Sequence, residues 1–143
     1  MRIFLDSSVV LAACGSDRGA SSYLFAQSDC GIWELLVSPY VLSEVTDNLN
    51  DLPPAWTSNW KKYRTCLSVV DDVTTIPHGV VFPAKKDRPI LFSAFAFADL
   101  LLVLDVADFG PLMGTGFYSL PVMTPGLFLK SLRESGELPR LKS

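Results

Sequence analysis

The chain has 143 residues, of which 49% are hydrophobic and 19% are charged. This is the size and composition of one globular domain, and it excludes a disordered tail or a fibrous repeat. The net charge of −3 excludes simple polycation binding to nucleic acid as the main activity. We therefore expect a single domain over residues 1–143.

The first part of the chain is predicted to alternate between strands and helices. In chain order we expect a strand over 2–5, a helix carrying 9–13, a turn over 15–19, a helix over 20–29, a strand over 33–37 and a helix from 38 to about 49. The last helix has the clearest start, because Ser38 suits the N-cap and Pro39 suits the first helical position.

The rest of the chain continues the alternation. We expect a loop over 50–58, a helix over 59–68, a strand over 69–76, a loop over 77–86, a helix opened by Asp87-Arg88-Pro89, a strand over 100–104, an irregular Gly-rich stretch over 110–119, a strand over 121–123 and a helix from 124 to about 133. Asp87 is the expected N-cap of its helix.

The strands are continuous apolar runs rather than alternating ones, as in a parallel sheet that is covered on both faces. The predicted fold is α/β, a three-layer α/β/α sandwich with a mainly parallel sheet of about five strands.

Three cysteines without a CxxC pair are present: Cys14, Cys30 and Cys66. We expect them to be reduced thiols, and the single histidine, His78, argues against a zinc site. The apolar run 90–104 is too short to span a bilayer and contains Asp99. These features predict a cytoplasmic protein without a membrane segment.

Several acidic residues are expected to meet at the carboxyl edge of the sheet. Asp6 and Asp105 each follow a strand, Asp87 opens a helix, and Glu44 lies within two turns of the helix start at Ser38. In a parallel sheet these positions fall on one edge. The candidate site is Asp6, Glu44, Asp87 and Asp105, with Asp108 close behind.

Such a cluster of carboxylates is costly unless a cation offsets the repulsion. A site made only of carboxylates, without His or Cys, selects Mg²⁺ or Mn²⁺. Bound cations turn a repulsive pocket into one that accepts phosphate, and a metal-bound water becomes a nucleophile.

Each acid also has an ordinary structural interpretation. Taken alone, Asp87 suits an N-cap, and Asp6 could cap the helix that follows it. Glu44 could be a solvated helix residue, and Asp105 could lie in a turn. Asp99 is expected in a loop or at a helix end, without a catalytic role. What points specifically to a functional site is the joint placement of the four acids at one edge of the sheet.

The sequence resembles the PIN-domain family of metal-dependent ribonucleases, which includes the VapC-type toxins. The resemblance is carried by five motifs in order: Ile3-Phe4-Leu5-Asp6-Ser7-Ser8-Val9-Val10, Ser38-Pro39-Tyr40-Val41-Leu42-Ser43-Glu44-Val45, Lys86-Asp87-Arg88-Pro89-Ile90, Ala98-Asp99-Leu100-Leu101-Leu102-Val103-Leu104-Asp105 and Met123-Thr124-Pro125-Gly126-Leu127-Phe128-Leu129. They span nearly the whole chain.

The resemblance implies roles for individual residues. Asp6, Glu44, Asp87 and Asp105 would be ligands of Mg²⁺ or Mn²⁺, with Asp108 as a fifth, and Ser8 would hydrogen-bond near Asp6 and organise the site. It also implies RNA as substrate, an antitoxin partner and a homodimer. The chain departs from the family at Val103, where Thr or Ser is usual.

Two other interpretations stay open. The first is a PIN-like module that binds RNA or protein without catalysis, which Val103 favours and the intact acids disfavour. The second, more remote, is a response-regulator receiver with Asp105 as phospho-acceptor, although too little chain follows Asp105 to complete that fold. A haloacid-dehalogenase-type phosphatase is excluded because position 8 is Ser8 rather than Asp.

Basic residues around the acids are the expected contacts for RNA: Lys61, Lys62, Arg64, Lys85, Lys86 and Arg88. Trp56, Trp60 and Tyr63 are available to stack on bases, although buried aromatic side chains on a solvated helix are an equally good interpretation. The sequence identifies neither the RNA target nor an antitoxin.

Overall fold

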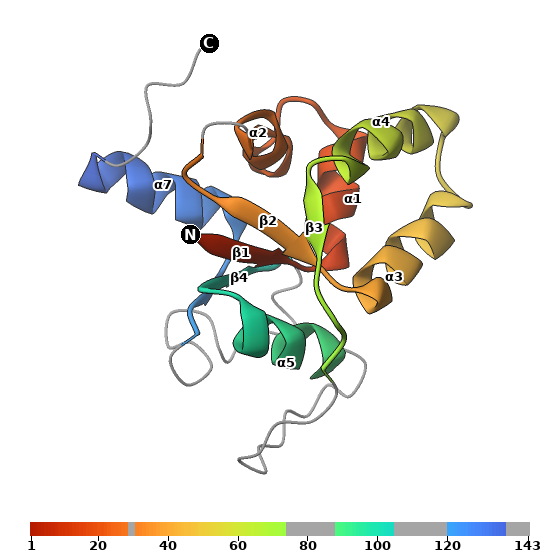
Figure 1. Ribbon diagram of the computed structural model, residues 1–143. Coiled ribbons are helices and arrows are strands. Elements are labelled where there is room, and N and C mark those ends of the chain that lie inside the picture. Colours follow the sequence, from red (N-terminus) through yellow and green to blue (C-terminus); the bar gives the residue numbers. More distant parts are fainter. Residues whose placement is uncertain (29–30, 74–87, 105–119, 137–143) are drawn as a thin grey trace.

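A parallel five-stranded sheet forms the centre of the protein (Figure 1). The computed structural model describes residues 1–28, 31–73, 88–104 and 120–136. The strands are β1 (Arg2–Leu5), β2 (Glu34–Val37), β3 (Leu67–Val69), β4 (Leu100–Leu102) and β5 (Val122–Met123). Their order is β3-β2-β1-β4-β5, and every neighbouring pair is parallel. β1 is therefore the central strand.

The apolar residues of β1 and β4 are buried as their sequences predict, whereas Ser68 and Val69 of β3 are exposed. Ile3, Phe4 and Leu5 of β1 are fully buried, and all three residues of β4 are buried as well. A strand whose successive side chains are all buried must be covered on both faces, because those side chains point alternately to opposite sides.

Helices cover both faces of the sheet. They are α1 (Ser7–Gly15), α2 (Ala20–Ala26), α3 (Pro39–Leu49), α4 (Pro54–Arg64), α5 (Arg88–Phe97) and α7 (Pro125–Ser135). α5 contacts β1 and β4 on one side, and Figure 1 shows α1, α2 and α4 on the other side. α7 contacts α2. The predicted three-layer α/β/α architecture is confirmed.

The prediction for the segment after α3 is wrong in its boundaries. α4 begins at Pro54 rather than at residue 59 and ends at Arg64, so β3 begins at Leu67 rather than at residue 69. Pro53-Pro54 falls within the stretch predicted as a loop, but a proline with its fixed φ suits the first turn of a helix, where its missing N–H costs nothing. β3 then pairs with β2 from Leu67.

Other elements are shorter than predicted or lie outside the described residues. α2 ends at Ala26 rather than at residue 29, and β4 ends at Leu102 rather than at residue 104. The strand predicted over 69–76 is also wrong at its end, because β3 ends at Val69 and residues 70–73 are not in a strand. The loop 77–86, the Asp87 N-cap and the Gly-rich stretch 110–119 lie outside the described residues. Within the described ranges, no helix is long and apolar enough to cross a membrane.

Candidate functional site

Asp6 stands at the carboxyl end of the central strand. Its N–H donates to the carbonyl of Leu102 on β4 at 3.0 Å, and its own carbonyl accepts from the N–H of Val9 in α1 at 3.1 Å. The side chain is only 4% exposed and makes no capping hydrogen bond to α1. The alternative interpretation of Asp6 as a helix-capping side chain therefore does not hold. Its carboxylate is buried at the edge of the sheet.

The hydroxyl of Ser8 connects this carboxylate to β4. It donates a short hydrogen bond to Oδ2 of Asp6 and accepts one from the N–H of Leu104 at 3.3 Å. The hydrogen bond expected between Ser8 and Asp6 is thus present. Because Leu104 follows β4, Ser8 fixes the Asp6 carboxylate relative to the end of the neighbouring strand.

Glu44 approaches the same region from α3. Val41, Val45 and Leu49 form the buried side of this helix, and Glu44 is half-buried beside them. Oε1 of Glu44 accepts a hydrogen bond from the hydroxyl of Ser7 at 3.3 Å. Glu44 is therefore not a simple solvated helix residue.

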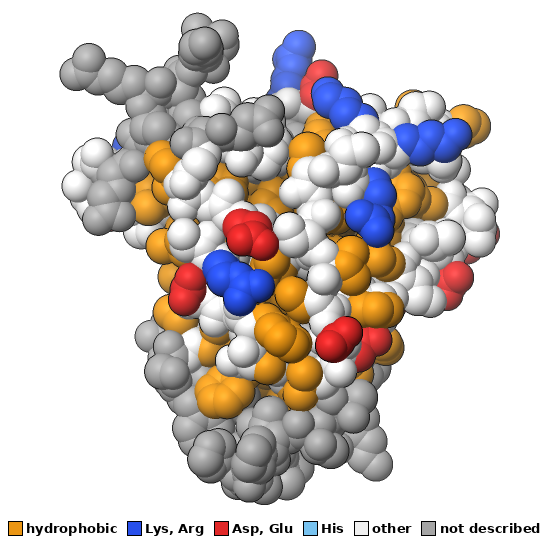
Figure 2. Space-filling model, viewed as in Figure 1, with side chains coloured by type: hydrophobic (Ala, Val, Ile, Leu, Met, Phe, Trp, Pro, Cys, Tyr) orange, Lys and Arg blue, Asp and Glu red, His pale blue; other side chains and the backbone are white. Residues whose placement is uncertain are grey.

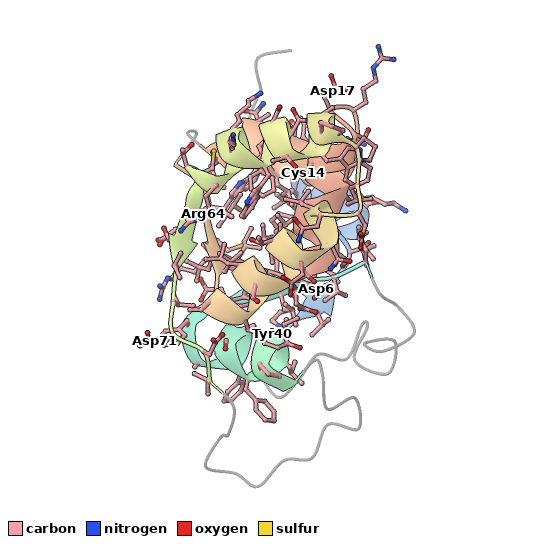
Figure 3. The ribbon with its side chains drawn as sticks, turned by 90° about the vertical axis from the view of Figure 1, so that its right-hand side faces the viewer. Asp6, Cys14, Asp17, Tyr40, Arg64 and Asp71 are labelled. Carbon is pink, nitrogen blue, oxygen red and sulfur yellow. The ribbon has the colours of Figure 1, made fainter. Side chains whose placement is uncertain are left out.

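The sequence interpretation did not assign a role to Ser7. Ser7 and Ser8 are consecutive residues in the first turn of α1, and they hold the two acids that come from β1 and α3. Figure 3 shows Asp6 close to the ribbon of α3. Two adjacent hydroxyls directly after a strand-end acid were the signal that could have identified this arrangement.

Ser38 has a buried hydroxyl that makes no hydrogen bond within the described ranges. It occupies the N-cap of α3 as predicted, but its side chain does not cap the helix. The carboxylate of Asp72 does so instead, accepting from the N–H of Tyr40 at 3.1 Å. The Ser38 side chain is fully buried, and its Oγ has no partner among the described residues.

The strand register places Ser38 beside Asp6. Phe4 of β1 pairs with Leu36 of β2, so Asp6 and Ser38 follow their strands at the same level. Adjacent strands lie roughly 4.8 Å apart. A buried hydroxyl without a partner is costly, and an added water or ligand at this edge would relieve that cost.

These residues fit a hard divalent cation. Asp6 and Glu44 offer carboxylates, and Ser7, Ser8 and Ser38 offer hydroxyls, an all-oxygen set that suits Mg²⁺ or Mn²⁺ rather than zinc. Asp87, Asp105 and Asp108 lie outside the described residues. Across the ranges that the structure does describe, no group of three His, Cys, Asp or Glu side chains comes together.

Replacing Ser38 with Ala is expected to stabilise the metal-free protein by about 1 kcal/mol, because an unsatisfied buried hydroxyl is removed. Mn²⁺ is expected to raise the melting temperature of S38A less than that of the wild type. Thermal denaturation with and without Mn²⁺ measures both effects, and Ser68→Ala on the exposed part of β3 is the control. A clear loss of stability in S38A without metal would contradict this assignment.

The basic residues of α4 do not form the expected rim around the acids. Figure 3 shows Arg64 and Asp6 well apart, and Lys62 lines a cavity that contains neither Asp6 nor Glu44. Lys85 and Lys86 lie outside the described residues, as does the side chain of Arg88.

The aromatic residues near these bases are largely packed into the protein. Trp56 and Trp60 pack partly buried against the core. Tyr63 is buried, with its ring centroid 4.7 Å from that of Phe25. The interpretation as buried aromatic side chains therefore holds for Tyr63.

Asp99 and the described cysteines, Cys14 and Cys66, are not part of the candidate site. Asp99 accepts a hydrogen bond from the N–H of Arg2 at 2.8 Å, at the amino end of the sheet. Cys14 and Cys66 are free, and burial raises the pKa of Cys14 to about 11, so that its thiol stays protonated at neutral pH. Cys30 lies outside the described residues.

Comparison with known proteins gives a structural similarity but no match in sequence. No family model matches the chain, and no curated protein matches it. A crystal structure of VapBC2 from Rickettsia felis, bound to a DNA fragment from their promoter, is similar with a TM-score of 0.60 and 14% sequence identity. The similarity covers 85% of this chain and 97% of the other. The expectation of a VapC-type PIN fold is thereby confirmed.

Proposed function

We propose that this chain, with its VapC-type PIN fold, is a metal-dependent endoribonuclease and the toxin of a toxin–antitoxin pair. The observation that carries the proposal is the pair of acids at the carboxyl edge of the sheet, where Ser8 holds Asp6 and Ser7 holds Glu44. Ligand sites in open α/β sheets lie at this edge.

The proposed site binds Mg²⁺ or Mn²⁺ through Asp6 and Glu44, with Asp87, Asp105 and Asp108 as further proposed ligands. A bound cation supplies an activated water and stabilises the leaving oxygen of a phosphodiester. Ser8 keeps the Asp6 carboxylate in one orientation relative to β4, and Ser7 does the same for Glu44 from α1. These hydrogen bonds pre-organise the two acids before any cation arrives.

The proposal includes the wider organisation of the protein. We take residues 1–143 as one PIN-like domain that acts in the cytoplasm as a homodimer and is inhibited by a small antitoxin. The similarity to a structure of a VapBC2 complex supports an antitoxin partner. Co-purification of the chain with the product of a neighbouring gene tests this part of the proposal.

The alternative function is a PIN-like module that binds RNA or protein without catalysis. The observation that favours it is Val103, a fully buried residue that carries no hydroxyl where Thr or Ser is usual in the family. Mn²⁺ titration separates the two functions. A rise in the melting temperature supports the nuclease, and an unchanged melting temperature supports the inert module.

Cleavage is tested directly with labelled single-stranded RNA in Mg²⁺ or Mn²⁺. The expected result is hydrolysis that stops in excess EDTA and returns when the cation is restored. Failure to cleave any of a broad set of cellular RNAs, together with an unchanged melting temperature in Mn²⁺, would overturn the nuclease proposal.

Val103→Thr is expected to raise the cleavage rate severalfold and to lower stability slightly. The two side chains are nearly isosteric, but a buried hydroxyl costs about 1–3 kcal/mol unless it finds a partner. Val122→Thr, on buried β5, is the control and should lose stability without a gain in rate. Single-turnover cleavage and urea denaturation measure the two effects. An unchanged rate in V103T would mean that the site is complete with valine.

A further inference from the structure

A cavity of about 510 Å³ lies near the end of α1 that is remote from Asp6. Its wall is formed by three segments far apart in sequence: residues 17–26, the end of α4 and one side of α7. Figure 3 shows Asp17, one of its lining residues, at the top of the view and well apart from Asp6. The nine residues of α1 span about 13 Å between the two places. The cavity is therefore separate from the site of the acids.

The wall of this cavity is strongly cationic. Four lining side chains are basic and one is acidic: Arg18, Lys62, Lys130 and Arg133, with Asp17. The chain as a whole carries a net charge of −3, so the positive charge of this part of the surface is opposite in sign to the net charge. Figure 2 shows several blue side chains with one red among them along the edge over α4 and the α1–α2 connection.

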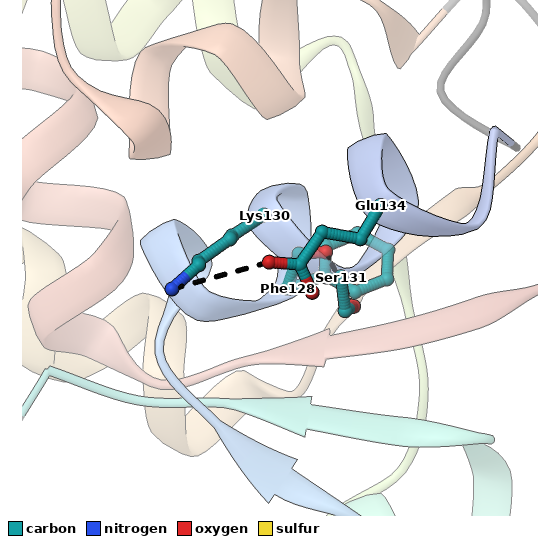
Figure 4. A network of polar contacts seen from close by, with 4 residues as sticks. All are labelled: Phe128, Lys130, Ser131 and Glu134. Carbon is teal, nitrogen blue, oxygen red and sulfur yellow. Dashed lines mark hydrogen bonds and ion pairs between the residues drawn. The ribbon is translucent and has the colours of Figure 1, made fainter.

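Among the residues that the structure describes, most of these cations have no carboxylate partner. Across the described ranges, Lys130 alone of the four forms an ion pair, with Glu134 at 4.0 Å (Figure 4). Both of these side chains are more than two-thirds exposed, and such an i,i+4 pair is weak and screened by salt. The positive charge of the cavity is therefore available to an anionic ligand.

Two tyrosine side chains line the cavity beside the basic residues. Tyr23 is half-buried and Tyr63 is buried, and both line the cavity. The ammonium of Lys62 lies 5.5 Å from the centroid of the Tyr63 ring. Burial raises the pKa of Tyr63, so that its hydroxyl remains protonated and able to donate at neutral pH.

We propose that this cavity binds the phosphate backbone of single-stranded RNA at a point away from the cleavage site. Cations from three segments spaced around one hollow suit successive phosphates, and the half-buried ring of Tyr23 offers a surface for a base. The proposal rests on the proposed ribonuclease function, because it assigns a second contact to the same substrate. An acidic protein segment is the competing occupant.

Binding is measured by fluorescence anisotropy of a labelled oligoribonucleotide of about ten nucleotides, in EDTA so that it is not cleaved. Lys62→Gln and Arg133→Gln are each expected to weaken binding roughly fivefold and to reduce the slope of log K against log salt by about 0.7. Lys62→Arg keeps the charge, and Arg2→Gln removes an exposed charge outside the cavity. Both controls should stay within about twofold of the wild type.

Gly126 allows a test that adds a group instead of removing one. It lines the cavity in the first turn of α7, and a Cβ built there meets nothing within 4 Å. Gly126→Glu therefore adds an acidic side chain at the cavity wall whose Cβ meets no neighbour, at a helix start that favours negative charge. We expect unchanged or higher thermal stability and a loss of RNA binding of at least roughly tenfold, whereas Gly126→Ala should bind nearly normally.

The outcomes separate this inference from the proposed nuclease function. If RNA is cleaved and the double variant Lys62→Gln/Arg133→Gln shows an unchanged KM and unchanged binding, the cavity inference is wrong and the nuclease stands. If RNA is bound through these residues but never cleaved, the cavity inference stands and the nuclease fails. Equal losses in Arg2→Gln, or tight binding of poly-glutamate in place of RNA, would also overturn the cavity inference.

Discussion

Replacement of Asp6 with Asn is expected to reduce metal-dependent RNA cleavage by at least about 100-fold, since it removes one of the two described carboxylates of the proposed site. Stability without metal should be unchanged or higher. The substitution removes a buried charge near Glu44, and the Asn side-chain oxygen can still accept from Ser8. The rise in melting temperature that Mn²⁺ causes should be lost.

Cleavage assays and thermal denaturation in EDTA and in Mn²⁺ check each part of this result. Asp99→Asn is the matched control, because Asp99 accepts from the N–H of Arg2 at the opposite edge of the sheet and should keep full activity. Strong destabilisation of D6N in EDTA would show that Asp6 is a structural residue, and the proposed site would then be wrong.

Leu101→Ala is expected to lower the free energy of unfolding by about 2–5 kcal/mol. Leu101 is fully buried on β4 between β1 and β5, and truncation leaves a cavity that a packed sheet cannot collapse to fill. Urea denaturation of the metal-free protein measures the loss. The same substitution at Leu127, which is 49% exposed on α7, should change stability by less than about 0.5 kcal/mol.

Both variants replace leucine with alanine, so a difference in their stability reports the difference in burial between the two positions. A loss below 1 kcal/mol in L101A, or equal losses in both variants, would contradict the position of β4 inside a sheet covered on both faces. The register beside β1 also positions the proposed site, because β4 leads to Leu104, whose N–H donates a hydrogen bond to the hydroxyl of Ser8.

The sequence determined the architecture because its signals are local. Continuous apolar runs predicted buried parallel strands, and β1 and β4 are buried as expected. Thr124-Pro125 predicted a helix start, and the Thr124 side chain accepts from the N–H of Leu127 at 3.2 Å. Strand periodicity and N-caps depend on a few consecutive residues, so a single sequence contains them in full.

The same locality explains the wrong boundaries of α4 and β3. Pro53-Pro54 fits both a loop and a helix start, and only the packing of α4 against α1 decides between them. For the candidate site, the sequence placed Asp6 at a strand end and Glu44 beside an apolar helix face, and the structure agrees on both positions.

Contacts between distant segments were decided by the tertiary structure alone. Asp72 caps α3 in place of Ser38, across a separation of 32 residues from Tyr40. The Ser38 hydroxyl, beside Asp6, is thereby left buried with no hydrogen-bond partner in the described part of the chain. The cationic cavity likewise joins residues of α2, α4 and α7. Such pairings depend on how helices pack over the sheet, and packing is a property of the whole fold rather than of any local pattern.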